Sequence, residues 1–219
     1  MKTLTYCSDT SFLDPPEVYS KAYGSMPEYR RRKIDWFVFA KDKKLSMGVE
    51  LLLRNALGEL GEDMKDMVLV KNGKPALRGS DIQFNLSHSE TKVMCSVSDA
   101  DVGCDVEMIR PIDLDIARRY FFDSEFRAIE SCEGADMYDQ FYRFWTLKES
   151  FMKATGLGME LPLNAFKIVL GDPITVEQSV DGREYRFREF SVGDGYRYAC
   201  CSVNGDFSPM QQVRLDKVL

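Results

Sequence analysis

Hydrophobic residues recur with helical spacing in three segments of the chain. Residues 27–60 combine strong helix formers with few β-branched residues, and predict a helical region. Its apolar stripe consists of Leu51, Leu52, Leu53, Ala56, Leu57 and Leu60. Residues 113–132 predict a second helix, interrupted near residue 123. Residues 138–155 predict a third, which ends before Gly156, a residue type common just after a helix C-terminus.

Short apolar runs between turn residues predict strands in the rest of the chain. The first run, 67–71, ends in Asn72-Gly73, a strong turn signal. The other strand candidates are residues 82–86, 92–98, 102–108, 166–170, 174–178, 185–192 and 196–203. Residues 1–27 are punctuated by prolines and predict irregular structure.

The same order of elements occurs in both halves of the chain. Residues 1–103 and residues 104–219 each contain helix followed by short strands that look antiparallel. We therefore predict an α+β fold with an N-terminal lobe over residues 1–103 and a similar C-terminal lobe over residues 104–219.

The composition of the 219 residues, 44% hydrophobic and 29% charged, is that of a globular protein. No stretch approaches the roughly 18 apolar residues that a membrane span needs. The first nine residues lack the apolar segment of a secretory signal. Membrane and secreted classes are therefore disfavoured.

The cysteines show no Cys-x-x-Cys spacing, and His88 is the single histidine. Zinc ribbons, iron–sulfur sites and disulfide scaffolds all need regular cysteine spacing, and a multi-histidine metal site needs more histidines. We expect most of the cysteines to be small core residues in a reducing cytoplasm. The cysteines are Cys7, Cys95, Cys104, Cys132, Cys200 and Cys201.

The net charge of −6 argues against general nucleic-acid binding. The basic residues are nevertheless concentrated, because the window from Arg30 to Lys44 holds seven bases against two acids. Such a patch on an acidic protein suits a compact polyanionic ligand, although a solvated helix face explains the charge equally well.

Asp105 and Glu107 lie two residues apart on a predicted strand, so both side chains project from one face. Neighbouring carboxylates repel unless a cation or a proton separates them. Oxygen ligands of this kind suit Mg²⁺, which shares its shell with phosphates. The alternative is an exposed acidic strand edge.

The segment from Trp145 to Lys153 lies on the third predicted helix, whose apolar residues point in nearly every direction. Burial of Lys148, Glu149 and Lys153 therefore has a desolvation cost. A Glu149–Lys153 pair and a Lys148 that reaches solvent would account for much of it. The functional reading makes Glu149 a metal ligand or base and the lysines phosphate contacts.

Ser87 and His88 are adjacent on a predicted strand, so they face opposite sides and cannot act as a nucleophile–base pair. No Gly-x-Ser-x-Gly motif surrounds Ser87. The two side chains could instead hold a phosphate, or His88 could simply be a satisfied polar residue. In Asn72-Gly73-Lys74-Pro75 a lysine follows a turn glycine, which fits either a ligand contact or a plain surface turn.

Together these motifs resemble the 4′-phosphopantetheinyl transferase superfamily, in particular its larger, surfactin-synthetase-activating type. The resemblance rests on the order of four motifs: Gly73-Lys74-Pro75, Phe84-Asn85-x-Ser87-His88, Gly103-x-Asp105-x-Glu107 and Trp145-Thr146-x-Lys148-Glu149-Ser150-x-x-Lys153. Cys104 stands where the family usually has an aliphatic residue. No part of the first thirty residues contributes.

The resemblance implies a monomer of two α/β lobes related by a pseudo-twofold axis, with coenzyme A between them. It implies Mg²⁺-dependent (Mn²⁺ is possible) transfer of 4′-phosphopantetheine from coenzyme A to a serine of an apo acyl, peptidyl or aryl carrier protein. Adenosine 3′,5′-bisphosphate is the expected by-product. The alternatives are a non-catalytic module that binds coenzyme A or a carrier protein, and a phosphodiesterase that uses water as its nucleophile.

The resemblance also implies roles for single residues. Asp105, Glu107 and Glu149 are the implied metal ligands, and Glu149 is also a candidate base. Lys153 is implied to contact the pyrophosphate, with support from Lys148. Implied contacts to the adenosine phosphates are Lys74, Ser87, His88, Arg30, Lys41, Lys44 and Arg54, with His88 on the 3′-phosphate. Glu125 matches a position near the active site, and Trp145 is expected to be a core residue.

Overall fold

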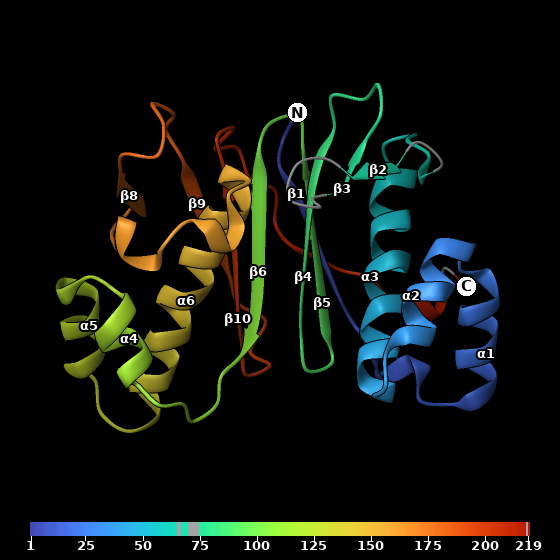
Figure 1. The fold of residues 1–219 in the computed structure, drawn as a ribbon, viewed down its shortest axis with the longest axis horizontal. Helices are drawn as coiled ribbons and strands as arrows, with labels where there is room; N and C mark the ends of the chain where they lie inside the picture. Colours follow the sequence, from blue (N-terminus) through green and yellow to red (C-terminus); the bar gives the residue numbers. More distant parts are fainter. Residues whose placement is uncertain (65–66, 70–74, 218) are drawn as a thin grey trace.

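The computed structural model describes residues 1–64, 67–69, 75–217 and 219. Two lobes lie side by side, and each contains one long helix packed against a sheet (Figure 1). The sheet strands pair antiparallel, except that the short strand at one edge of the first sheet is parallel to its neighbour. No helix in these ranges is long and apolar enough to cross a bilayer.

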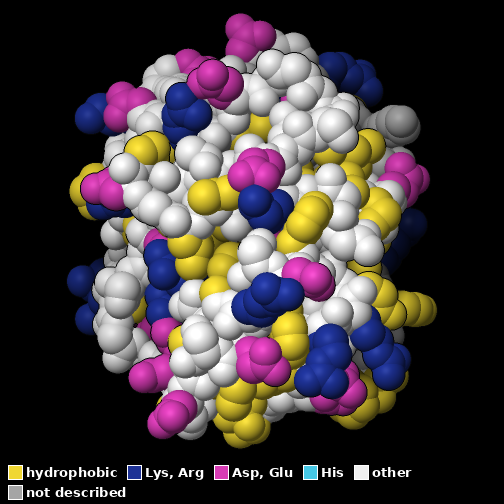
Figure 2. Space-filling model, turned by 90° about the vertical axis from the view of Figure 1, so that its left-hand side faces the viewer, with side chains coloured by type: hydrophobic (Ala, Val, Ile, Leu, Met, Phe, Trp, Pro, Cys, Tyr) yellow, Lys and Arg dark blue, Asp and Glu magenta, His cyan; other side chains and the backbone are white. Residues whose placement is uncertain are grey.

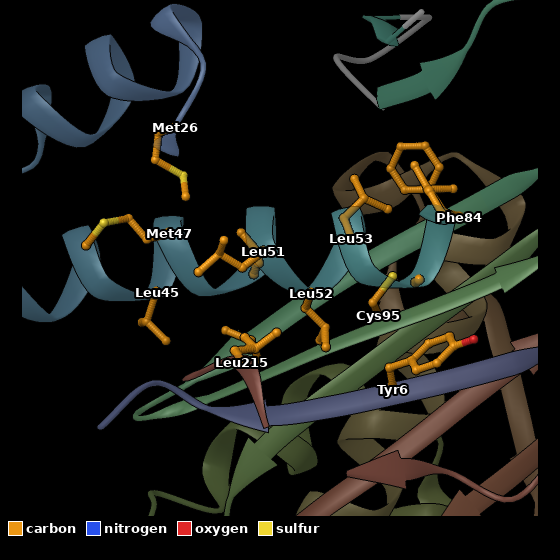
Figure 3. Close-up of a cluster of buried hydrophobic side chains, with 14 of the residues drawn as sticks. Tyr6, Met26, Leu45, Met47, Leu51, Leu52, Leu53, Phe84, Cys95 and Leu215 are labelled. Atoms are coloured by element: carbon orange, nitrogen blue, oxygen red, sulfur yellow. The ribbon is translucent and has the colours of Figure 1, made fainter. Parts of the chain in front are cut away.

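The first lobe has a sheet with strand order β11-β1-β5-β4. Its strands are β1 (Leu4–Asp9), β4 (Gln83–Ser89), β5 (Lys92–Ser98) and β11 (Gln211–Gln212), and its helices are α1 (Pro16–Ser25), α2 (Glu28–Trp36) and α3 (Ala40–Gly58). The helix α3 buries its leucines in the core of this lobe, which also holds Tyr6 and Cys95 from the strands (Figure 3). The apolar stripe of the sequence is thus the core-facing side of α3.

The second lobe has a sheet with strand order β6-β10-β9. Its strands are β6 (Val102–Met108), β9 (Arg186–Phe190) and β10 (Tyr196–Ser202), and its helices are α4 (Asp115–Tyr120), α5 (Asp123–Glu130) and α6 (Ala135–Thr155). The helix α6 ends at Gly156, whose φ of 75° is the left-handed conformation that glycine adopts without strain.

Small elements complete both lobes. Two-stranded sheets are formed by β2 (Met67–Leu69) with β3 (Pro75–Leu77), and by β7 (Phe166–Val169) with β8 (Thr175–Gln178). Short 3-10 helices cover Thr10–Leu13, Gly158–Glu160, Leu163–Ala165 and Leu215–Lys217. On the face that carries α4 and α5, basic, acidic and hydrophobic side chains are interspersed (Figure 2).

The lobes repeat one topology. In the order β1-α3-β4-β5 and in the order β6-α6-β9-β10, the first strand pairs antiparallel with the last, which pairs antiparallel with the third. This repeat confirms the predicted α+β fold of two similar lobes. The division after residue 103 stays a prediction. In the structure β6 begins at Val102, and β11 returns the chain to the first sheet by pairing with β1.

Two local predictions are wrong. Residues 1–27 are not irregular, because β1 pairs with β5 and α1 begins directly after Pro15. A proline at the start of a helix is compatible with helical structure, since the first turn leaves its N–H groups unpaired. The helical region 27–60 is two helices, separated at Phe37–Phe39. The predicted strands within the described residues match β2 and β4–β10 to within a few residues.

Candidate active site

The two lobes meet along strands β4 and β6, which are joined through side chains instead of backbone pairs. Asn85 Oδ1 accepts from the Cys104 N–H at 3.0 Å, and Ser87 Oγ accepts from the Val106 N–H at 3.3 Å. Ser89 Oγ accepts from the Met108 N–H at 3.2 Å. Alternate residues of β4 thus satisfy backbone donors at the edge of the second sheet, where an unpaired N–H would be costly if buried.

We call this contact between β4 and β6 the seam. The side-chain ammonium of Lys153 lies at the seam, beside Asp105 and Ser87. Lys153 Nζ lies 2.7 Å from Asp105 Oδ1 and donates to Cys104 O at 3.1 Å. Ser87 Oγ lies 3.2 Å from the same ammonium and donates to Asp105 Oδ1 at 2.7 Å. Ser87 is buried in this network, where its hydroxyl positions Asp105 and Lys153. Its contact with a phosphate stays a prediction.

Gly103 makes the close approach of α6 to β6 possible. A Cβ at this position would lie 2.1 Å from Ser150 O and 2.4 Å from Ala154 N, both backbone atoms of α6. Because these atoms cannot move independently of the helix, glycine is needed here. The contact sets the height of α6 over β6, and with it the reach of Lys153 toward Asp105.

Negative charge accumulates around Asp105. Burial raises the pKa of Glu107, and the charge of Asp105 adds to this rise, while Ser89 donates to Glu107 Oε2 at 2.7 Å and opposes it. Burial also raises the pKa of Glu149, where Lys153 opposes the rise and Asp105 reinforces it. Asp105 Oδ2 is buried without a hydrogen-bond partner. The site therefore has more carboxylate oxygen than the nearby lysine neutralises.

Burial lowers the pKa of Lys153, but Asp105, Cys104 and Glu149 outweigh that effect and leave the pKa above its usual value. The lysine is therefore charged across the physiological range. The three carboxylates do not form a ready-made metal site: within the described ranges, no three histidine, cysteine or acidic residues are arranged to hold a metal ion.

Lys148 does not belong to this site. Its side chain is fully buried, and Nζ lies 2.8 Å from Glu125 Oε2. It also donates to Leu163 O at 2.9 Å and to Phe166 O at 3.0 Å. All three ammonium protons are used, so the predicted phosphate contact of Lys148 is wrong. Glu125 is its buried partner.

Trp145 is half-buried in the core of the second lobe, as expected, with its ring 5.7 Å from that of Phe141.

A cavity of about 1120 Å³ opens beside the seam in the first lobe. Its lining includes His88, Arg54 and Lys33, together with Met26 and Phe84 from the core. Strand alternation places His88 on the face opposite to Ser87, as the sequence predicted. Desolvation lowers the pKa of His88, and the charges of Lys153 and Lys33 lower it further. The cavity thus offers several cationic or hydrogen-bonding groups above apolar walls.

The other predicted phosphate contacts have partners of their own. Arg30 lines the cavity but pairs with the buried Glu50 at 2.7 Å. Lys41 lies 2.6 Å from Glu90, and Lys44 pairs with Asp14. Arg54 donates to Ser25 O at 3.2 Å. Lys74 lies outside the described residues.

Sequence reasoning missed Asn85, Ser89 and Lys33. The first two were visible as an alternation of short polar residues, Asn85-x-Ser87-x-Ser89, on a strand with a buried Phe84. No local signal separates Lys33 from the other bases of its window. Its place on the wall of the cavity follows from the direction of α2.

Known proteins resemble this chain over most of its length. The sequence model of the 4′-phosphopantetheinyl transferase superfamily matches residues 101–201. The 4′-phosphopantetheinyl transferase gsp of Aneurinibacillus migulanus is 33% identical over 186 residues, which cover 83% of this chain and 77% of that protein. The 4′-phosphopantetheinyl transferase Sfp of Bacillus subtilis (strain 168) is 29% identical over 184 residues, covering 81% and 82% of the two chains.

Among solved structures, the holo-[acyl-carrier-protein] synthase of Thermotoga maritima aligns with a TM-score of 0.40 at 18% identity, over 47% of this chain and 62% of that chain. The relationship to the Aneurinibacillus enzyme exceeds 30% identity and extends over more than two thirds of its length. The chain therefore belongs to the 4′-phosphopantetheinyl transferase superfamily and is a 4′-phosphopantetheinyl transferase.

Proposed function

We propose that this enzyme transfers the 4′-phosphopantetheine of coenzyme A to a serine hydroxyl of an apo acyl, peptidyl or aryl carrier protein. The observation that carries the proposal is the position of Lys153 and its carboxylates on the seam, beside a cavity whose lining includes Arg54, Lys33 and His88. We further propose that it acts as a cytoplasmic monomer. Six unpaired cysteines support a reducing compartment.

The cavity suits the adenosine end of coenzyme A. Its volume of about 1120 Å³ exceeds that of an ordinary small-molecule pocket, which holds about 300–1,000 Å³. His88, Arg54 and Lys33 supply hydrogen bonds or charge for phosphate groups, and His88 is our candidate for the 3′-phosphate. Arg30, although paired with Glu50, adds positive electrostatic potential to the cavity wall. Lys74, on the chain just before Pro75 of the cavity wall, remains a proposed contact.

Although no three of these groups are arranged as a metal site within the described residues, their oxygen donors suit a hard divalent cation, most simply Mg²⁺. Asp105 has a buried oxygen without a partner. Burial and the charge of Asp105 raise the pKa values of Glu107 and Glu149, and a bound cation would favour their ionised forms. We propose Asp105, Glu107 and Glu149 as its ligands. When bound, Mg²⁺ would neutralise pyrophosphate charge as a hard Lewis acid.

In the proposed step, the serine oxygen forms a bond to the β-phosphorus of coenzyme A. The bond from that phosphorus to the oxygen bridging the two phosphates breaks, and adenosine 3′,5′-bisphosphate leaves with the electron pair. Glu149 takes the serine proton, directly or through a water, and its raised pKa makes it a stronger base than an exposed glutamate. Lys153 stabilises charge on the pyrophosphate. Asp105 and Ser87 hold its ammonium in place.

The proposal is tested by incubating an apo carrier protein with the enzyme, coenzyme A and Mg²⁺ and measuring the intact mass of the carrier. A parallel incubation with EDTA is the control. We expect the carrier to gain one phosphopantetheine only when Mg²⁺ is present. Coenzyme A binding without transfer to any carrier would indicate a non-catalytic module, and cleavage of coenzyme A without a carrier would indicate a phosphodiesterase.

Single variants test the assigned roles. Glu149→Gln should abolish transfer, whereas Glu130→Gln, which changes an exposed glutamate of α5, should not. Equal rates for Glu149→Gln and wild type would remove Glu149 from the reaction. His88→Ala should raise the KM for coenzyme A by about tenfold or more, the worth of one hydrogen bond to a charged group. Dephospho-coenzyme A should show little change, and equal losses on both substrates would remove the 3′-phosphate role.

A further inference from the structure

The junction between α2 and α3 exposes large hydrophobic side chains. Trp36 is 79% exposed, Val38 is 85% exposed and Phe39 is 71% exposed. The Trp36 ring contacts that of its neighbour Phe37 with a centroid separation of 6.0 Å. We call Trp36, Val38 and Phe39 the α2–α3 patch. Adjacent exposed apolar residues of this size mark interaction sites, whereas single ones are ordinary.

The α2–α3 patch lies at the rim of the proposed active site. One turn before it on α2, Lys33 lines the cavity that also contains His88. Shortly after it on α3, Lys41 pairs at 2.6 Å with Glu90, the residue that follows Ser89 of the seam. Residues on either side of the α2–α3 patch thus contact the cavity or the residue next to the seam.

Positive charge surrounds the α2–α3 patch. Arg31 and Lys33 precede it and Lys43 follows it, and none of the three forms an ion pair within the described part of the chain. Asp35 and Asp42 lie in the same stretch, so these three bases exceed the two acids by one. Trp with Arg is the composition that dominates protein–protein hot spots. The α2–α3 patch and its basic neighbours therefore suit a partner face that has apolar residues at its centre and acidic residues around them.

We propose that the α2–α3 patch docks the carrier protein, through a face of that protein with apolar residues at its centre and acidic residues around them. This inference rests on the proposed function, because only a macromolecular substrate that presents a serine at the seam must cover this rim. A membrane or a second copy bound here would obstruct the same approach. Local charge then explains how an enzyme of net charge −6 attracts an acidic partner.

The test uses two patch variants, Trp36→Ala and the double variant Val38→Glu with Phe39→Glu. Met159→Glu is the matched control, because Met159 is 87% exposed in the second lobe, beyond the C-terminal end of α6. With an apo acyl carrier protein, the patch variants should raise the KM for the carrier by about tenfold or more, the effect of losing a hot-spot residue. The kcat and the KM for coenzyme A should stay within about twofold of wild type.

A binding measurement separates this inference from the proposed reaction. Calorimetry with a carrier whose accepting serine is replaced by alanine needs no transfer, and the patch variants should bind it about tenfold more weakly than wild type and Met159→Glu. Equal affinity for all four proteins would overturn the docking surface, whether or not transfer occurs. Patch-dependent sedimentation with phosphatidylglycerol–phosphatidylcholine vesicles would overturn it in favour of a membrane.

Discussion

Replacement of Lys148 by methionine should destabilise this protein far more than replacement of an exposed lysine. Lys148 and Glu125 form an ion pair at 2.8 Å in which both side chains are almost fully buried. Methionine keeps the length and apolar packing of lysine. It removes the cation from Glu125 and the donors from the carbonyl groups of Leu163 and Phe166.

The expected cost follows from the charge left behind. Breaking a buried ion pair on one side costs about 3–5 kcal/mol, because the remaining charge loses its counter-ion. The Glu125 carboxylate keeps only the hydrogen bonds from the Phe122 and Ile168 N–H groups. Each kcal/mol lowers Tm by about 2–4 °C in a domain of this size, so Tm should fall by about 6–20 °C. The double variant Lys148→Met with Glu125→Gln should recover at least about 1 kcal/mol of this loss, since no unpaired charge remains.

Thermal and urea unfolding, followed by circular dichroism, measure the loss of stability of Lys148→Met. The control is Lys167→Met, which breaks a pair of similar length (2.7 Å to Glu177) in which Glu177 is largely exposed. Such a pair is worth about 0–1 kcal/mol. The reasoning is refuted if the two variants melt within about 2 °C of each other.

Two further predictions concern the active-site helix and its charges. Gly103→Ala should destabilise the protein by at least about 1–3 kcal/mol in urea denaturation and lower kcat, because its Cβ would lie 2.1 Å from Ser150 O. The control is Gly24→Ala on α1, where the Cβ would meet no atom within 4 Å. It should stabilise the protein by about 0.5–1 kcal/mol in the same assay. Equal effects would contradict the close-approach argument. The raised pKa values of Glu107 and Glu149 lower the stability of metal-free protein as pH rises through them, so added Mg²⁺ should raise Tm more at pH 8 than at pH 5.5. A shift that is independent of pH, or one that survives Glu107→Gln with Glu149→Gln, would argue against these ligands.

Elements with a local signal could be predicted from the sequence. The helix α6, its end at Gly156 and the strand β6 all follow from periodicity, turn residues and capping. The strand β1 could not be found in this way, because its partners β5 and β11 lie about 90 and 200 residues along the chain. Its assignment depends on those long-range pairs, which local propensity does not report.

The sequence by itself determined that Ser87 and His88 face opposite sides of a strand. It also placed two carboxylates on β6, and a carboxylate and two lysines in the Trp145–Lys153 segment of α6. These properties follow from strand and helix periodicity. Only the tertiary structure decided which lysine of α6 faces which partner. Lys148 meets Glu125 of α5 in the core, whereas Lys153 meets Asp105 of β6 at the seam. The reason is physical: an apolar helix buries both side chains, and the neighbours that other elements bring to each one decide whether its charge stabilises the core or serves the site.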